Sequence, residues 1–151
     1  MDDRHRGDLP IEALSARPAG PGDEAFELAL LGGPLPELQR AAQRREFLHR
    51  FPGSQPEIVC QGGEPVGRVW LWRGEGATHL VDLIVAPAHR GRGLGTALLR
   101  GLLATGGPVR LSVAVANTRA QRLYERLGFR VTQRSETHLH MEASGADATR
   151  R

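Results

Sequence analysis

Apolar residues recur along this chain with two spacings, one typical of helices and the other typical of strands. In the first third of the chain, the spacing predicts one strand and two helices, at 11–19, 25–31 and 37–51. Pro52 and Gly53 end the second of these helices. Three short apolar runs separated by turn-forming residues come next, at 57–61, 66–72 and 79–85. These runs predict three consecutive antiparallel strands.

The second half of the chain alternates helices and strands. Leucines recur at helical spacing from Leu94 to Leu103, and Gly106 then ends the predicted helix. The remaining periodic segments predict a strand, a helix and two short strands, at 109–115, 118–127, 129–131 and 137–141. The order β-α-α-β-β-β-α-β-α-β-β predicts an α/β fold, with a mixed sheet of six to seven strands flanked by about four helices.

Length and composition predict a single small globular domain. The 151 residues fit one domain, which we place at 11–142 between flexible ends at 1–10 and 143–151. Neither an apolar run of about 18 residues nor a secretory signal occurs, so we expect a soluble, cytoplasmic protein that does not bind membranes. Cys60 is the lone cysteine, which excludes an internal disulfide and a cysteine-built zinc site.

The positive charge of this chain comes entirely from arginine. All 20 residues counted as lysine or arginine are arginine. The absence of lysine excludes a Walker phosphate loop, a pyridoxal enzyme and a protein kinase, each of which requires a lysine at a fixed place. Because the arginines are interspersed with 17 acidic residues, nucleic-acid binding is not favoured.

A basic, glycine-rich turn connects the strand that ends at Val85 to the helix that begins near Leu94. Gly91, Gly93 and Gly95 allow the backbone to approach a ligand closely and to direct several N–H groups at one place. The positive end of the following helix and two arginines would add to the attraction for a pyrophosphate. A Rossmann site is not supported, because the preceding strand belongs to a meander rather than to a βαβ unit.

This turn resembles the acetyl-CoA loop of the GNAT acetyltransferases. The family pattern is Arg or Gln, two residues, Gly, one residue, then Gly or Ala, and Arg90, Gly93 and Gly95 match it. The segment 117–129 is similar to the second cofactor-binding segment of that family. The resemblance covers 79–131 and implies a GNAT fold with a splayed sheet, acetyl-CoA as co-substrate and no metal.

The resemblance also implies which residues bind acetyl-CoA. The loop would hold the pyrophosphate, and the last strand residues before it would pair with the pantetheine amides as in β-strand addition. The implied set is Leu83, Ile84, Val85, Arg90, Gly91, Arg92, Gly93, Leu94, Gly95, Asn117 and Tyr124. For Asn117, capping of the helix that starts at Thr118 is an alternative role.

Three residues are candidates for proton transfer in such a reaction. The resemblance implies that Tyr124 lies close to the coenzyme sulfur, where it would act as the catalytic acid; core packing is the alternative. His79 begins the strand that leads to the loop and is the first candidate for the base, with a solvated strand end as the alternative. Asp82, alone in an apolar strand, is the second candidate, and it could instead cap a helix or pair with an arginine.

The acceptor would be a small-molecule amine or an amine of a peptide or protein. Arginines on the helix 37–51 could attract a carboxylate-bearing amine, although the spacing favours a solvated helix face; these are Arg40, Arg44, Arg45 and Arg50. Two other classes stay open, a non-catalytic acyl-CoA binding module and an arginine-rich nucleic-acid-associated protein. Pairing of strands at the C-terminal edge of the sheet makes a homodimer a further hypothesis.

Overall fold

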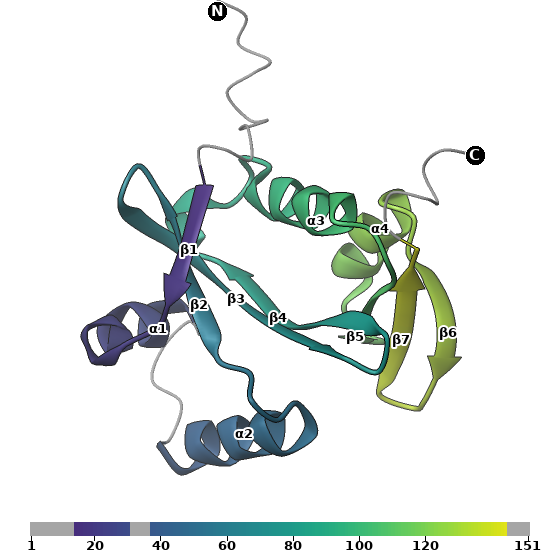
Figure 1. Cartoon of the computed structure of the whole chain (residues 1–151), viewed down its shortest axis with the longest axis horizontal. Coiled ribbons are helices and arrows are strands. Elements are labelled where there is room, and N and C mark those ends of the chain that lie inside the picture. The colour runs from purple at the N-terminus through teal and green to yellow at the C-terminus, as the bar shows by residue number, and fades with distance from the viewer. Residues whose placement is uncertain (1–13, 31–36, 145–151) are drawn as a thin grey trace, which may run out of the picture. The chain divides into compact units, whose positions relative to one another are not determined.

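The computed structural model describes residues 14–30 and 37–144 and contains the elements in the predicted order (Figure 1). The strands are β1 (Leu14–Pro18), β2 (Pro56–Gln61), β3 (Glu64–Gly74), β4 (Ala77–Val85), β5 (Val109–Ala114), β6 (Arg130–Arg134) and β7 (His138–Ala143). The helices are α1 (Glu24–Leu30), α2 (Glu37–Arg50), α3 (Leu94–Ala104) and α4 (Thr118–Arg126). Short 3₁₀ turns at Pro21–Asp23 and Pro87–His89 were not predicted.

The strands are hydrogen-bonded in the order β1-β2-β3-β4-β5-β7-β6. The pairs β1–β2, β2–β3, β5–β7 and β6–β7 are antiparallel, whereas β4 and β5 are parallel. The predicted α/β class with a mixed, mostly antiparallel sheet is therefore confirmed. The described residues divide into two compact units, the first formed by 14–30, 37–72 and 81–95 and the second by 73–80 and 96–144.

The first unit is built around β2. Its central residues Ile58, Val59 and Cys60 are all buried, so both faces of the strand are covered. Aromatic contacts tie α2 to β3: Phe47 meets the ring of Trp70 edge-on at 5.3 Å, and Phe51 lies 5.5 Å from Trp72. The indole nitrogens of these tryptophans donate to Ser54 Oγ and the Pro52 carbonyl, both at 2.8 Å.

The predicted apolar face of α2 is only partly right. Phe47 and Ala41 are half-buried, but Leu38 is 84% exposed. Arg40 is half-buried instead. It lies seven residues before Phe47, and this spacing of two helical turns places both side chains on the same side of the helix. The inward side of α2 therefore includes an arginine that the sequence pattern assigned to solvent.

The second unit contains β5, β6 and β7, with β5 beside β7 and β7 beside β6 (Figure 1). Burial alternates along β5, where Val109, Leu111 and Val113 are buried as the strict apolar alternation predicts. In α4, the polar residue Gln121 is half-buried, whereas the other polar positions from Thr118 to Arg126 are exposed. The four apolar-face positions are all half-buried; they are Ala120, Leu123, Tyr124 and Leu127. The pattern predicted for α4 is confirmed, and that of β5 is confirmed as far as Val113. Val115, the last apolar residue of the predicted strand 109–115, lies beyond the end of β5 and is 39% exposed.

The boundaries predicted for the domain lie mostly outside the described residues. This applies to 1–10, to the first three residues of the strand predicted at 11–19 and to the last seven residues of 143–151. β7 includes Ala143, one residue beyond the predicted end of the domain, and this residue is buried. The single domain at 11–142 stays a prediction. Within the described segments, we find no helix with the length and hydrophobicity of a membrane span.

Candidate functional site

The predicted strand–loop–helix arrangement is present between β4 and α3. Ala86 follows β4, and its N–H donates to the Val66 carbonyl of β3 at 2.8 Å, which anchors the start of the loop. After the 3₁₀ turn, Gly91 and Gly93 have φ angles of 76° and 80°, in the left-handed region that glycine tolerates without strain. α3 begins at the next residue, Leu94. Two residues in the left-handed conformation therefore come just before a helix N-terminus.

Both arginines of the loop are held by neighbouring groups. Arg90 donates from Nε to the Val85 carbonyl at 3.0 Å, which ties its guanidinium to the end of β4. Arg92 Nη1 lies 2.9 Å from His89 Nδ1, and His89 Nε2 lies 3.6 Å from a carboxylate oxygen of Glu64. These contacts position two permanently charged groups beside the glycines.

The donors of this loop fit a pyrophosphate. α3 has no acidic residue in its first turn, so its partial positive charge is not offset there. A side chain at Gly91 would point into open space, and its absence lets a ligand reach the backbone. Backbone N–H groups at a helix N-terminus and two guanidinium groups are the donors that bind phosphate oxygens in proteins.

The register between β4 and β5 covers only the first part of β4. β4 pairs with β5 from Thr78 to Leu80, while β5 pairs with β7 as far as Ala114. Beyond Leu80, every residue from Val81 to Val85 is half-buried, which includes Leu83 and Ile84 of the predicted site. On its β3 side the strand is close-packed, since a Cβ added at Gly67 would lie 2.6 Å from the Ile84 carbonyl oxygen.

Asp82 is paired with an arginine, as one of its alternative roles supposed. Its carboxylate accepts from Arg68 Nη2, and Arg68 Nη1 lies 3.0 Å from Glu27 Oε1. Burial disfavours the charged guanidinium, but the hydrogen bonds and charges of the two carboxylates outweigh it and raise the pKa of Arg68. Arg68 thus links α1, β3 and β4 through charge-assisted hydrogen bonds.

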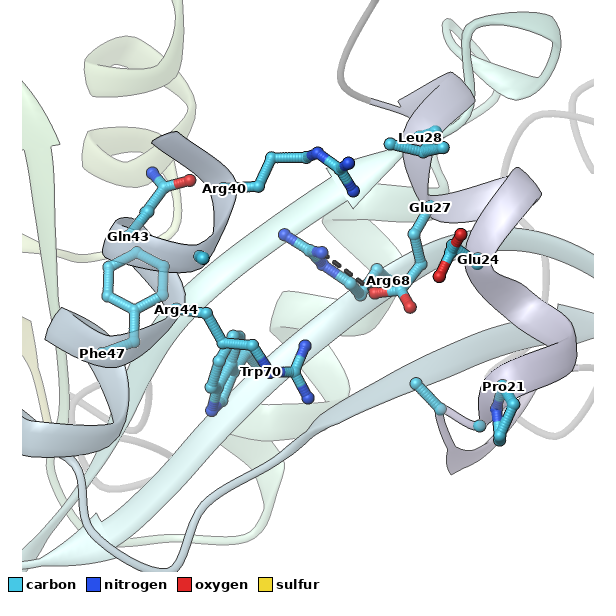
Figure 2. A pocket seen from close by; sticks show the side chains of 13 residues that line it. Pro21, Glu24, Glu27, Leu28, Arg40, Gln43, Arg44, Phe47, Arg68 and Trp70 are labelled. Atoms are coloured by element: carbon cyan, nitrogen blue, oxygen red, sulfur yellow. Dashed lines mark hydrogen bonds and ion pairs between the residues drawn. The ribbon is translucent and has the colours of Figure 1, made fainter. Parts of the chain in front are cut away.

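A cleft of about 620 Å³ lies beside this triad, lined by α1, α2 and β3 (Figure 2). We call it the charged cleft, because Glu24, Glu27, Arg40, Arg44 and Arg68 are among its lining residues. The sequence pointed to this cleft only through the arginines of the helix 37–51, for which it favoured a solvated face. That prediction is wrong for Arg40, which is half-buried and lines the cleft. That side chain extends toward the centre of the cleft in Figure 2.

The candidates in the second unit have defined local environments. Tyr124 is half-buried in α4 and meets the ring of Phe129 edge-on at 5.7 Å. Asn117 accepts the Ala120 N–H at its Oδ1 over 3.1 Å, which confirms its role as the N-cap of α4. His79 has a side chain that is 16% exposed, with Nε2 3.8 Å from Glu75 Oε1.

Fold and loop together define a class of small α/β proteins in which a central strand, a glycine-rich turn and a helix follow one another directly. The profile of the acetyltransferase (GNAT) family matches residues 24–129. The chain belongs to this family, which confirms the resemblance seen in its two sequence segments.

Individual relatives agree with this membership. The chain is 38% identical over 97 residues to the peptidyl-lysine N-acetyltransferase YjaB of Salmonella typhimurium, a match that covers 63% of this chain and 64% of the relative. It therefore spans less than two thirds of the length of that protein.

Solved structures share the fold. The spermidine N-acetyltransferase from Vibrio cholerae in complex with CoA and spermine has a TM-score of 0.67 at 20% identity, over 91% of this chain and 99% of that chain. An acetyltransferase from Thermus thermophilus has a TM-score of 0.66 at 23% identity, over 90% of this chain and 99% of that chain. The GNAT fold expected from the sequence is thereby confirmed.

Proposed function

We propose that this chain transfers the acetyl group of acetyl-CoA to a primary amine by direct attack in a ternary complex. The observation that carries the proposal is the pair of left-handed glycines, Gly91 and Gly93. They alternate with the two loop arginines and come directly before the N-terminus of α3. Membership of the GNAT family supports acetyl transfer as the use of such a site. When bound, acetyl-CoA supplies the activated thioester.

Residues of the first unit would hold this co-substrate. The loop amides, with Arg90 and Arg92, would bind the pyrophosphate oxygens. Backbone groups of Leu83 and Val85 would pair with the pantetheine amides, because this half of β4 lies beyond the residues that pair with β5. A backbone N–H near Val85 is our candidate donor to the thioester oxygen, which gains negative charge as the amine attacks.

The proton balance requires a base and an acid. The acceptor ammonium has a pKa of about 10, so only about one molecule in a thousand is deprotonated at pH 7. Since Asp82 already accepts from Arg68, we assign His79 as the base. Alternation places His79 on the face of β4 opposite Asp82, so we propose that the proton reaches it through water. The amine nitrogen then forms the C–N bond and releases its second proton to solvent, and the C–S bond breaks. The departing thiolate takes a hydrogen bond or proton from the Tyr124 hydroxyl, which solvent reprotonates.

Isothermal titration with acetyl-CoA tests the cofactor part of the proposal. We expect binding with a dissociation constant on the order of micromolar, weakened about a hundredfold or more by Gly93→Asp, because a carboxylate would repel the pyrophosphate. Gly95→Asp should act in the same direction. Gly106→Asp is the matched control, since Gly106 has a φ of 83° but follows the C-terminal end of α3.

The titration discriminates between the functions that the sequence left open. Binding that is lost in Gly93→Asp and kept in Gly106→Asp supports the proposal and leads to a screen for amine-dependent thiol release. Binding without turnover on any amine would favour the non-catalytic acyl-CoA module. If the native chain does not bind acetyl-CoA, the acetyltransferase proposal is wrong.

Substitution of Tyr124 tests the proposed acid. Tyr124→Phe keeps the ring and its contact with Phe129 but removes the hydroxyl, so we expect kcat to fall about a hundredfold or more while acetyl-CoA affinity is unchanged. A kcat within a factor of about two of the native value would assign Tyr124 to packing alone.

A further inference from the structure

The charged cleft has two ends of opposite sign. Around Arg68, the lining carboxylates of Glu24 and Glu27 exceed the single guanidinium by one negative charge. Asp82 of β4 does not line the cleft, but it binds Arg68 and adds a second negative charge beside it. From α2, Arg40 and Arg44 supply two positive charges on the other side (Figure 2). The cleft is therefore dipolar, and a ligand with one cationic and one anionic group would match both ends.

The three arginines of the charged cleft differ in how they are used. Arg68 binds two carboxylates, and Arg44 places its guanidinium 5.8 Å from the centre of the Trp70 ring. The Nε atoms of Arg40 and Arg68 are both buried with no hydrogen-bond partner in the described part of the chain, but Arg68 is also bound to two carboxylates through its Nη atoms. A buried guanidinium donor without a partner is costly, and a ligand acceptor atom would satisfy it.

We propose that the charged cleft binds the acceptor amine as an aminocarboxylate, with the carboxylate at Arg40 and Arg44 and the ammonium at the acidic end. This inference rests on the proposed acetyl transfer and names its substrate class. A guanidinium fork matches a carboxylate in shape and charge, and the planar face of Arg44 is already supported by Trp70.

The acidic end of the charged cleft adjoins the strand assigned to the co-substrate. Asp82, bound to Arg68, lies three positions before Val85, the strand residue whose carbonyl accepts from Arg90 of the loop. Alternation places Asp82 and Ile84 on one face of β4, and Leu83 and Val85 on the other. An ammonium held at this end therefore lies one strand residue from the backbone groups that we assign to pantetheine.

The same charge distribution disfavours a polyamine. An amine with cationic groups along its whole length would satisfy the acidic end but would place a further positive charge against Arg40 and Arg44. Like charges at a few ångströms repel, most strongly where solvent is partly excluded. We therefore expect this chain to discriminate against diamines and spermidine.

The experiment compares acceptors that differ only in the carboxylate. Thiol release from acetyl-CoA is measured with α- and ω-amino acids of increasing length, with their carboxamides, and with cadaverine and spermidine. Dipeptides and their C-terminal amides form a second arm, which separates free amino acids from peptide ends. We expect kcat/KM to be about tenfold or more higher for the carboxylate than for its carboxamide in the best pair.

Variants of α2 test which arginine gives the preference for a carboxylate acceptor. Arg40→Gln should raise KM for the carboxylate acceptor about tenfold or more, with little change for its carboxamide, and Arg40→Lys should restore part of the preference. Arg45→Gln is the matched control, because Arg45 is an exposed arginine of the same helix that does not line the cleft. Arg40→Glu should shift the preference toward cadaverine. Unchanged acetyl-CoA affinity in each variant shows that the fold is intact.

The possible outcomes distinguish a failure of the aminocarboxylate inference from a failure of the proposed acetyl transfer. Acetyl-CoA binding with carboxamides or spermidine preferred in every comparison would overturn the aminocarboxylate inference and leave acetyl transfer in place. Equal effects of Arg40→Gln and Arg45→Gln would also overturn it. Absence of acetyl-CoA binding would overturn both.

Discussion

The loop between β4 and α3 and the charged cleft are built from different kinds of contact. The loop is one continuous segment, and its arginines contact residues three and five positions away, His89 and Val85. The charged cleft is assembled from three elements, and Arg68 alone joins residues 41 and 14 positions away, Glu27 and Asp82. The loop arginines therefore join few distant parts of the chain, whereas a change at Arg68 affects folding and binding together.

Loss of the Arg68 guanidinium should have the largest effect on stability. Arg68→Met leaves Glu27 and Asp82 facing each other in a position where Arg68 itself is only 12% exposed. We expect the free energy of unfolding at neutral pH to fall by about 3 kcal/mol in urea denaturation. Adding Glu27→Gln and Asp82→Asn should recover most of this loss. An undiminished loss in the triple variant would show that packing, rather than charge, holds the three elements together.

The close approach of β3 and β4 should have the next largest effect. Gly67→Ala introduces a Cβ 2.6 Å from the Ile84 carbonyl oxygen, and this contact is with backbone that cannot rotate away. We expect a loss of about 2 kcal/mol in the free energy of unfolding, measured in the same way. Gly22→Ala, where the added Cβ meets nothing within 4 Å, should be close to neutral. Similar values for the two variants would contradict the steric explanation.

Loss of the N-cap at Asn117, a short-range contact, should lower the free energy of unfolding by less than either of these changes. Asn117→Ala removes the N-cap of α4 and should cost about 1 kcal/mol of stability, whereas Asn117→Asp keeps the capping oxygen. Titration of Asn117→Asp with acetyl-CoA then isolates the role implied by the family resemblance. Weaker binding would assign the side-chain amide to the co-substrate, and unchanged binding would leave Asn117 as a cap only.

The smallest expected effect is a dependence on acidic pH. Arg17 Nη2 lies 2.8 Å from Asp23 Oδ1, and this bond, with a second from the Gly20 N–H, lowers the pKa of Asp23 from 3.8 to about 2. A lowered pKa means that the contribution is full above about pH 4 and is lost as the pH falls through about 2. The difference in thermal midpoint between the native chain and Asp23→Asn should therefore shrink from about pH 5 to about pH 2. A constant difference would assign the effect to something other than titration.

This division between short-range and long-range contacts also explains what the sequence could predict. Periodicity and turn residues are local, so the order of elements, the loop at Arg90–Gly95 and the cap at Asn117 followed from spacing. The pairing of Arg68 with Glu27 depends on how α1 lies against β3, which no local pattern contains. Arg40 is half-buried and Leu38 is 84% exposed, the reverse of what their polarity indicates, because a helix with many arginines has no clear apolar face.

The roles of Tyr124 and His79 stay predictions for the same reason. Each local environment is described, but a catalytic role depends on the position of bound substrates. The acceptor class, a homodimer and a cytoplasmic location likewise depend on partners outside the chain. Family membership supports the proposed acetyl transfer, and measurements on this chain test it.

The arginines of the charged cleft have a chemical consequence for an acetyltransferase. A lysine at position 40, 44 or 68 would carry a primary amine, and acetylation of that amine would abolish its charge. Guanidinium groups stay protonated at working pH and therefore have no free nitrogen lone pair with which to attack a thioester. In the proposed reaction, a cleft lined with Arg40, Arg44 and Arg68 would hold the acceptor carboxylate beside the acyl group through many turnovers without becoming a substrate itself.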